Sequence, residues 1–277
     1  MSLSSDELER YARHIVLHEI GGPGQQRLKA AHAVVVGAGG LGCPALLYLA
    51  AAGVGQITII DDDMVSLSNL QRQVLYATSE VGRPKAEAAA EALSRINPEI
   101  SVRAVVDRLQ AENAARLLEG ANLVLDGSDN AATRYTVNAA AIEAGIPLVA
   151  AAIGRWEGQV GVFDPARGGP CYVCAFPEAP DPDLVPACAE AGVLGALAGV
   201  IGAMQAVEAV KLIAGAGEAL TGRLMLYDAL SAETRVLRLR PRAGCRACGD
   251  GEAARRRPER YSMRALSGSA TSTQTRR

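Results

Sequence analysis

From residue 33 onward, short apolar segments of the chain alternate with longer segments that have helical periodicity. Each apolar segment is a nearly continuous run of Val, Ile, Leu and Ala, which is typical of a strand buried on both faces of a parallel sheet. Helices between such strands form right-handed crossovers, so the pattern predicts a doubly wound α/β fold with a mostly parallel sheet. The predicted strands are 33–37, 56–61, 100–106, 121–127 and 146–153, and the predicted helices are 41–53, 83–98, 111–120 and 130–145.

The pattern changes after residue 154. Three further segments are typical of strands but lack the regular helical crossovers of the first half, and they predict an antiparallel C-terminal extension: 158–163, 222–228 and 233–241. The tail 251–277 is polar, basic and rich in Ser and Thr, so we expect it to be disordered.

One apolar segment, 191–215, approaches the length of a membrane span. It contains Glu208 and Lys211, is rich in Gly and Ala, and has no basic flank, so a buried helix is expected and membrane insertion is not. The net charge of −2 gives no general electrostatic reason to bind nucleic acid or an anionic membrane. The N-terminus has no basic segment followed by an apolar one, so we expect a cytoplasmic protein without a secretory signal.

The sequence GAGGLG (37–42) follows the first predicted strand and opens the first crossover helix. This is the position of the GxGxxG loop in Rossmann-like folds, where backbone N–H groups at a helix N-terminus bind phosphate. Gly37 permits the tight turn, and Gly39 and Gly40 let the backbone approach the phosphate. Asp61 ends the second strand, where a carboxylate accepts hydrogen bonds from a ribose. The loop alone does not distinguish NAD from ATP.

The residues after the second strand favour ATP. They are DMVSLSNLQRQ (63–73), and Lys85 follows near the start of a helix. An adenylating enzyme must neutralise the charge that grows on departing pyrophosphate, whereas an NAD site has no need for several cations. Arg72 is the candidate for a bidentate phosphate contact, Lys85 for a point charge, and Arg13 is a third cation. For Arg13 and Lys85 the alternative is a solvated helix face.

The fourth predicted strand ends in LDGSDN (125–130), at the edge of the sheet where doubly wound folds bind ligands. The Asp129 carboxylate is a candidate ligand for Mg²⁺ that bridges ATP phosphates. Capping of the next helix is the alternative role for Asp126 and for Asp129.

Four of the six cysteines form two CxxC pairs, Cys171 with Cys174 and Cys245 with Cys248. Four thiolates are the ligand set of a closed, tetrahedral, structural zinc site, and such a metal would clamp two distant segments. A redox CxxC is the alternative, but neither pair sits on the strand–helix turn that thioredoxin-like chemistry uses.

Seven motifs together resemble the MoeB/ThiF/HesA family, which is related to ubiquitin-activating enzymes. They occur in order over about residues 5–250, and the N-terminal RYARH fits as well; the motifs are GAGGLGCP, IIDDDMVSLSNLQRQ, VGRPKAEAA, DGSDN, CYVC, CAEAGVLG and CRACG. The resemblance implies an ATP-dependent adenylyltransferase that activates the terminal Gly carboxylate of a small ubiquitin-like sulfur carrier ending in Gly-Gly. Molybdopterin, thiamine and tRNA-thiolation pathways use such carriers. The residues expected at the ATP site are Gly37, Gly39, Gly40, Asp61, Ser68, Asn69, Leu70, Gln71, Arg72, Lys85, Asp129 and Asn130.

The resemblance also implies a homodimer, because Arg13 matches an Arg that reaches the active site of the other subunit. Cys188 resembles a Cys that in some members forms a covalent link to the carrier or to sulfur; an inert thiol is the alternative. We expect residues 1–250 to form one adenylation domain, with a nucleotide-binding half (about 30–154) and a part that binds the carrier and zinc (about 155–250). No rhodanese-sized domain follows, so sulfur would come from a separate cysteine desulfurase or rhodanese.

Three other functions compete with carrier adenylation. An NAD-dependent oxidoreductase would need a proton donor near the nicotinamide, and no His follows His32. A related ATP-dependent enzyme that modifies a tRNA base usually lacks the paired zinc cysteines. A non-catalytic zinc scaffold would not need Arg13, Arg72, Lys85 and Asp129.

Overall fold

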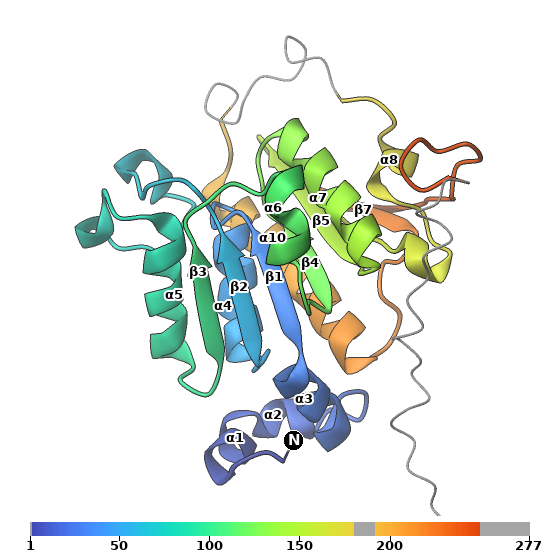
Figure 1. Cartoon of the computed structure of the whole chain (residues 1–277). Coiled ribbons are helices and arrows are strands. Elements are labelled where there is room, and N and C mark those ends of the chain that lie inside the picture. The colour runs from blue at the N-terminus through green and yellow to red at the C-terminus, as the bar shows by residue number, and fades with distance from the viewer. Residues whose placement is uncertain (1, 180–191, 250–277) are drawn as a thin grey trace, which may run out of the picture.

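The computed structural model describes residues 2–179 and 192–249, and its centre is one eight-stranded sheet with the order β3-β2-β1-β4-β5-β6-β7-β8 (Figure 1). The first five strands in this order are parallel, and β6, β7 and β8 are antiparallel. This confirms the predicted Rossmann-like, doubly wound sheet with its antiparallel extension. The strands are β1 (His32–Val36), β2 (Gln56–Ile60), β3 (Ser101–Val105), β4 (Leu123–Asp126), β5 (Leu148–Gly154), β6 (Glu157–Phe163), β7 (Arg223–Asp228) and β8 (Glu233–Arg238).

Two helical layers cover the parallel strands, because successive side chains of a strand point to opposite faces. On β1, Val35 belongs to one apolar core and Val34 to the other. The first core packs against α4 (Gly42–Ala51), α5 (Lys85–Ile96) and α10 (Gly195–Ala214), and the second against α6 (Ala111–Leu117) and α7 (Ala131–Ala144). Short helical elements lie in the connections: η1 (Leu67–Asn69), η2 (Thr78–Glu80), η3 (Pro165–Arg167) and α8 (Tyr172–Ala175).

The N-terminal helices α1 (Ser5–Arg10), α2 (Ala12–Ile15) and α3 (Gly21–Ala30) lie together at the end of the molecule where β1 begins (Figure 1). A capping box starts α1: the Ser4 hydroxyl accepts from the Glu7 N–H, and the Glu7 carboxylate accepts from the Ser4 N–H. Because α1, α2 and α3 lie where β1 begins, they are at the opposite end of the sheet from the carboxyl ends of the parallel strands.

The helix α10 is long and apolar enough to cross a membrane, but its residues Leu197, Ile201 and Ala209 are buried inside the protein. It packs on α4, α3 and the strands β5 and β6. Its buried Gln205 amide donates to the backbone carbonyls of Asp126 (2.8 Å) and Val149 (3.2 Å), which belong to β4 and β5. These contacts bury one face of α10 in the core, as expected of a helix that packs within the folded protein.

Candidate functional site

The glycine loop connects β1 to α4 in a conformation that only glycine adopts easily. Gly37 has φ +91°, and a Cβ there would lie 3.0 Å from the Gly127 carbonyl oxygen. A Cβ on Gly42 would overlap the Gly37 carbonyl oxygen, so the start of α4 can approach the turn only without a side chain. The loop thus brings free N–H groups at the start of α4 to the carboxyl edge of the sheet.

A cavity of about 390 Å³ opens at this edge, between the glycine loop and the ends of β2 and β4. It brings together residues that are far apart in the sequence. Ser68, Leu70 and Gln71 are not among the residues that line it. The predicted site residues that do line it are Gly37, Gly39, Gly40, Asp61, Asn69, Arg72, Lys85, Asp129 and Asn130.

Asp61 holds the glycine loop in place. One carboxylate oxygen accepts from the Ala38 N–H (2.7 Å) and the other from the Asp63 N–H (2.9 Å). Burial raises the pKa of Asp61, while these two donors and the nearby Lys85 ammonium oppose the rise. Each oxygen keeps acceptor capacity, so the carboxylate can still bind a ribose hydroxyl.

Two predicted cations point into the cavity from different segments. The Arg72 guanidinium donates to Asn69 Oδ1 (2.6 Å) and to the Ser68 carbonyl (3.3 Å), which fixes its direction. The Lys85 ammonium lies 2.8 Å from Asp63 Oδ2, and only 6% of its side chain is exposed. The alternative of a solvated helix face is therefore wrong for Lys85.

The helix after β4 is capped by Asn130, not by Asp126 or Asp129, for which capping was the alternative role. Asn130 Oδ1 accepts from the Thr133 N–H (2.9 Å) and caps α7. Asp126 is fully buried and accepts from the Ser128 N–H (2.9 Å) and hydroxyl (2.6 Å), while burial raises its pKa. The capping alternatives for Asp126 and Asp129 are thus wrong, and the exposed Asp129 lines the cavity.

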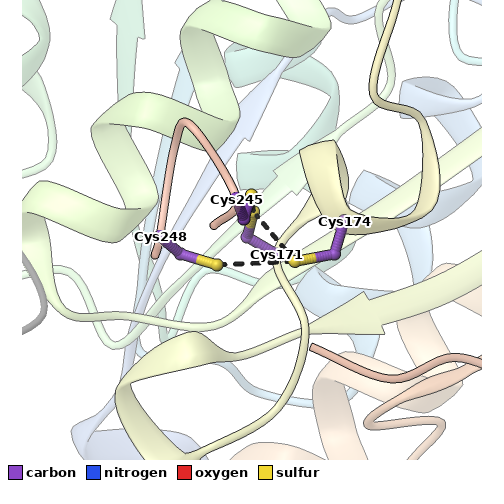
Figure 2. A group of neighbouring side chains, drawn as sticks. All are labelled: Cys171, Cys174, Cys245 and Cys248. Atoms are coloured by element: carbon purple, nitrogen blue, oxygen red, sulfur yellow. Dashed lines mark hydrogen bonds between the residues drawn. The ribbon is translucent and has the colours of Figure 1, made fainter. Parts of the chain in front are cut away.

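The four paired cysteines form a cluster beside α8, where two segments about seventy residues apart in sequence converge (Figure 2). Their sulfurs all lie within 4.8 Å of one another, with Cys171–Cys245 at 3.7 Å and Cys174–Cys248 at 3.5 Å. A tetrahedral zinc with Zn–S bonds of about 2.3 Å places its sulfurs about 3.8 Å apart. The cluster fits that geometry, and it lies away from the nucleotide cavity, as expected of a structural metal.

The model of the ThiF family matches residues 11–247. The chain belongs to the ThiF family. Two relatives of this ThiF-family protein cover nearly its whole length. The "SAMP-activating enzyme E1" of Haloferax volcanii is 49% identical over 91% of this chain and 92% of the relative, and the "Sulfur carrier protein adenylyltransferase" of Thermus thermophilus is 50% identical over 90% and 94%.

Solved structures of the Escherichia coli protein MccB are similar to this ThiF-family protein in fold. MccB with MccA-N7isoASN superposes with a TM-score of 0.77 at 25% identity, covering 87% of this chain and 75% of that one. The structure of MccB with ATP gives a TM-score of 0.76 at 24% identity, covering 86% and 74%. The predicted family resemblance and the predicted fold are confirmed.

The cavity of the ThiF-family protein contains two cations that the sequence analysis missed. Arg108 pairs with Asp62 (3.1 Å), and Arg134 donates to the Ser128 carbonyl (3.0 Å). Arg134 stands four residues after Asn130, so helical spacing from the cap of α7 was a signal that it faces the same edge. Arg108 has no comparable signal in its local sequence.

Arg13 does not join this site within one ThiF-family subunit. It is exposed on α2, at the opposite end of the sheet from the cavity (Figure 1). Cys188 and the tail 251–277 lie outside the described residues, so the predictions for them stay predictions.

Proposed function

We propose that this ThiF-family protein uses ATP to adenylate the C-terminal carboxylate of a small ubiquitin-like sulfur carrier ending in Gly-Gly, with release of pyrophosphate. The observation that carries the proposal is the convergence of Arg72, Lys85 and Asp129 on the glycine-loop cavity. An NAD-dependent oxidoreductase does not require that arrangement of charge. The names of two relatives with about half of their residues identical support the same reaction.

The reaction would proceed by attack of a carrier carboxylate oxygen on the α-phosphorus of ATP. The new O–P bond replaces the bond to the bridging oxygen, which leaves with its electron pair as pyrophosphate. No strong base is needed, because a carboxylate is ionised at neutral pH. Arg72 and Lys85 would neutralise the charge on the departing group, and glycine-loop N–H groups would hold the phosphates. Asp129 would hold the Mg²⁺ that supplies further neutralising charge.

A second cavity supports the carrier part of the proposal. It has a volume of about 410 Å³ and lies on the antiparallel part of the sheet, between β5 and β8. Ile153 lines both this cavity and the nucleotide cavity, so the two are neighbours. An extended C-terminus could therefore run from the antiparallel strands to the α-phosphate, while the folded part of the carrier rests on these strands.

We propose that the active protein is a homodimer. Arg13 is exposed and cannot reach the cavity of its own subunit from the far end of the sheet. The outer face of α10 exposes Val200 (40%) and Val207 (55%), and α4 exposes Tyr48 (59%), as expected of a surface that another subunit covers. A partner subunit could then supply Arg13 to the cavity.

Mixing two inactive variants tests this exchange of arginines. We expect Arg13→Ala and Arg72→Ala each to lack activity, and their mixture, refolded or co-expressed, to regain about a quarter of wild-type activity. Half of the dimers are then mixed, and each mixed dimer has one complete site. Two Arg72→Ala preparations mixed in the same way are the control. A mixture as inactive as the control would show that Arg13 does not act across the dimer.

The adenylation itself is tested by exchange of labelled pyrophosphate into ATP. We expect exchange only when a carrier ending in Gly-Gly is added, because pyrophosphate re-enters ATP only from an acyl-adenylate. The same carrier without its last Gly is the matched control and should give no exchange. Absence of exchange with every Gly-Gly-ended carrier of the same organism would refute the proposed function. The carriers that react would also indicate whether molybdopterin, thiamine or tRNA thiolation is served and which separate sulfur donor follows.

A further inference from the structure

Tyr76 is a buried residue that the proposed reaction does not use. It lies between η1 and η2, on the segment that follows Arg72, and 7% of it is exposed. Its hydroxyl donates to the Ala38 carbonyl oxygen at 2.7 Å, and the Lys85 carbonyl oxygen lies 3.3 Å away. One phenol thus touches the glycine loop and the first residue of α5, and it belongs to the segment that carries Arg72.

The Ala38 peptide groups are held from two sides. The Ala38 N–H donates to Asp61 (2.7 Å), and the Ala38 carbonyl accepts from the Tyr76 hydroxyl and from the Cys43 thiol (3.3 Å). Burial raises the pKa of Cys43 to about 12 and that of Tyr76 far above its usual range. Both groups therefore keep their protons and remain donors at neutral pH.

Peptide geometry connects this contact to the cavity. In a trans peptide, the carbonyl of one residue and the N–H of the next point in opposite directions. The Ala38 carbonyl points into the core, toward Tyr76 and Cys43, so the Gly39 N–H points the other way, and Gly39 lines the nucleotide cavity. Glycine rotates freely about its backbone bonds, so this peptide plane needs an anchor.

We propose that Tyr76 is a positioning residue: its hydroxyl anchors the Ala38 carbonyl and thereby keeps the Gly39 N–H directed at the phosphates of the nucleotide. The inference rests on the proposed function only in requiring ATP to bind in this cavity. Without the anchor, the peptide plane between Ala38 and Gly39 can turn, and the Ala38 carbonyl oxygen then faces the phosphates of the nucleotide. Tyr76 also keeps this loop in register with the segments that carry Arg72 and Lys85.

The variant Tyr76→Phe removes the hydroxyl and keeps the ring, so the core around it stays filled. We expect the Kd of ATP, measured by calorimetry on the full chain without carrier, to rise about 10-fold, in line with the loss of one buried hydrogen bond. The Kd of adenosine, which has no phosphate, should change by less than about 2-fold. In pyrophosphate exchange, KM for ATP should rise about as much as the Kd of ATP, while KM for the carrier stays constant.

Tyr135→Phe is the matched control. The Tyr135 hydroxyl also donates to a backbone carbonyl, that of Phe176 (2.9 Å), away from the glycine loop. Its loss should change thermal stability without changing the Kd of ATP. If Tyr76→Phe binds ATP as tightly as wild type, or if its Kd values for ATP and for adenosine rise equally, Tyr76 does not position the loop. If wild type itself binds no ATP, the proposed function has failed instead.

Cys43→Ala removes the other donor to the Ala38 carbonyl and tests the same anchor if Tyr76→Phe does not fold. Thermal unfolding would reveal such a failure to fold. A thiol is a weaker donor than a hydroxyl. We therefore expect a rise in the Kd of ATP in the same direction but of about 2- to 3-fold, again with adenosine binding unchanged. An unchanged Kd of ATP in this variant, with Tyr76→Phe unfolded, would count against the proposed anchor.

Discussion

Replacing Arg72 by Ala should lower the rate of ATP–pyrophosphate exchange by about 10²–10³-fold, because removal of one preorganised donor to a developing negative charge costs about 3–4 kcal/mol. The Arg72 side chain is preorganised for this task. Its guanidinium is held by Asn69 Oδ1 and by the Ser68 carbonyl, so it is oriented before the nucleotide binds. Arg72→Lys should recover little, since a lysine lacks the planar fork that binds two phosphate oxygens.

Arg83→Ala is the matched control for Arg72→Ala. Arg83 lies near Lys85 in sequence but pairs outward with Glu91 and Glu80, and it does not line the cavity. Exchange by this variant should stay within about 2-fold of wild type, as for most exposed ion pairs. Circular dichroism should show the same folded signal for all three variants. Exchange by Arg72→Ala at the wild-type rate would mean that the phosphates bind elsewhere.

Cys174→Ala should yield protein without stoichiometric zinc and with a Tm about 10 °C below that of wild type. A ligand that binds only the folded state at about a thousand times its Kd stabilises it by about 4 kcal/mol, and 1 kcal/mol shifts Tm by about 2–4 °C at this size. Three remaining thiolates cannot close a tetrahedral structural site. Metal analysis and calorimetry of protein purified without added zinc provide the measurement.

The control for the metal site is Cys188→Ala, which also removes one thiol but belongs to neither CxxC pair. It should keep one zinc per chain and the wild-type Tm. Wild-type protein free of zinc, or Cys174→Ala with a full complement of metal, would contradict the assignment of the four cysteines to a structural zinc.

Local sequence patterns were sufficient to predict the order of strands and helices. The run at 33–37 and the run at 56–61 each appear as a buried parallel strand, shifted by at most one residue at their ends. The glycine loop was predictable as well, because the turn and the close approach of α4 leave no space for side chains at Gly37 and Gly42. Likewise, the CxxC spacing restricts where the two sulfurs of each pair can lie, and this made the cluster of four cysteines predictable.

Long-range side-chain contacts were not predictable from these patterns. Lys85 is buried because Asp63 pairs with it across a 22-residue separation, and nothing in the local sequence distinguishes it from a solvated lysine. The cap of α7 is Asn130 and neither of the two aspartates considered for that role, because Asn and Asp compete about equally for the position. Arg108 enters the cavity through its pairing with Asp62, which depends on the register of neighbouring loops. The division of the adenylation domain into a nucleotide-binding half (about 30–154) and a part that binds the carrier and zinc (about 155–250) stays a prediction.

A metal bound at the cysteine cluster would close part of the chain into a ring. The stretch from Cys171 to Cys248 includes α10, β7 and β8, and the bound metal would tie its two ends together. A link between residues far apart in the sequence removes more chain entropy from the unfolded state than a link between nearby residues does. The outer strands β7 and β8 and the central α10 should therefore detach together or not at all while zinc is present, and chelation should free the edge of the sheet first.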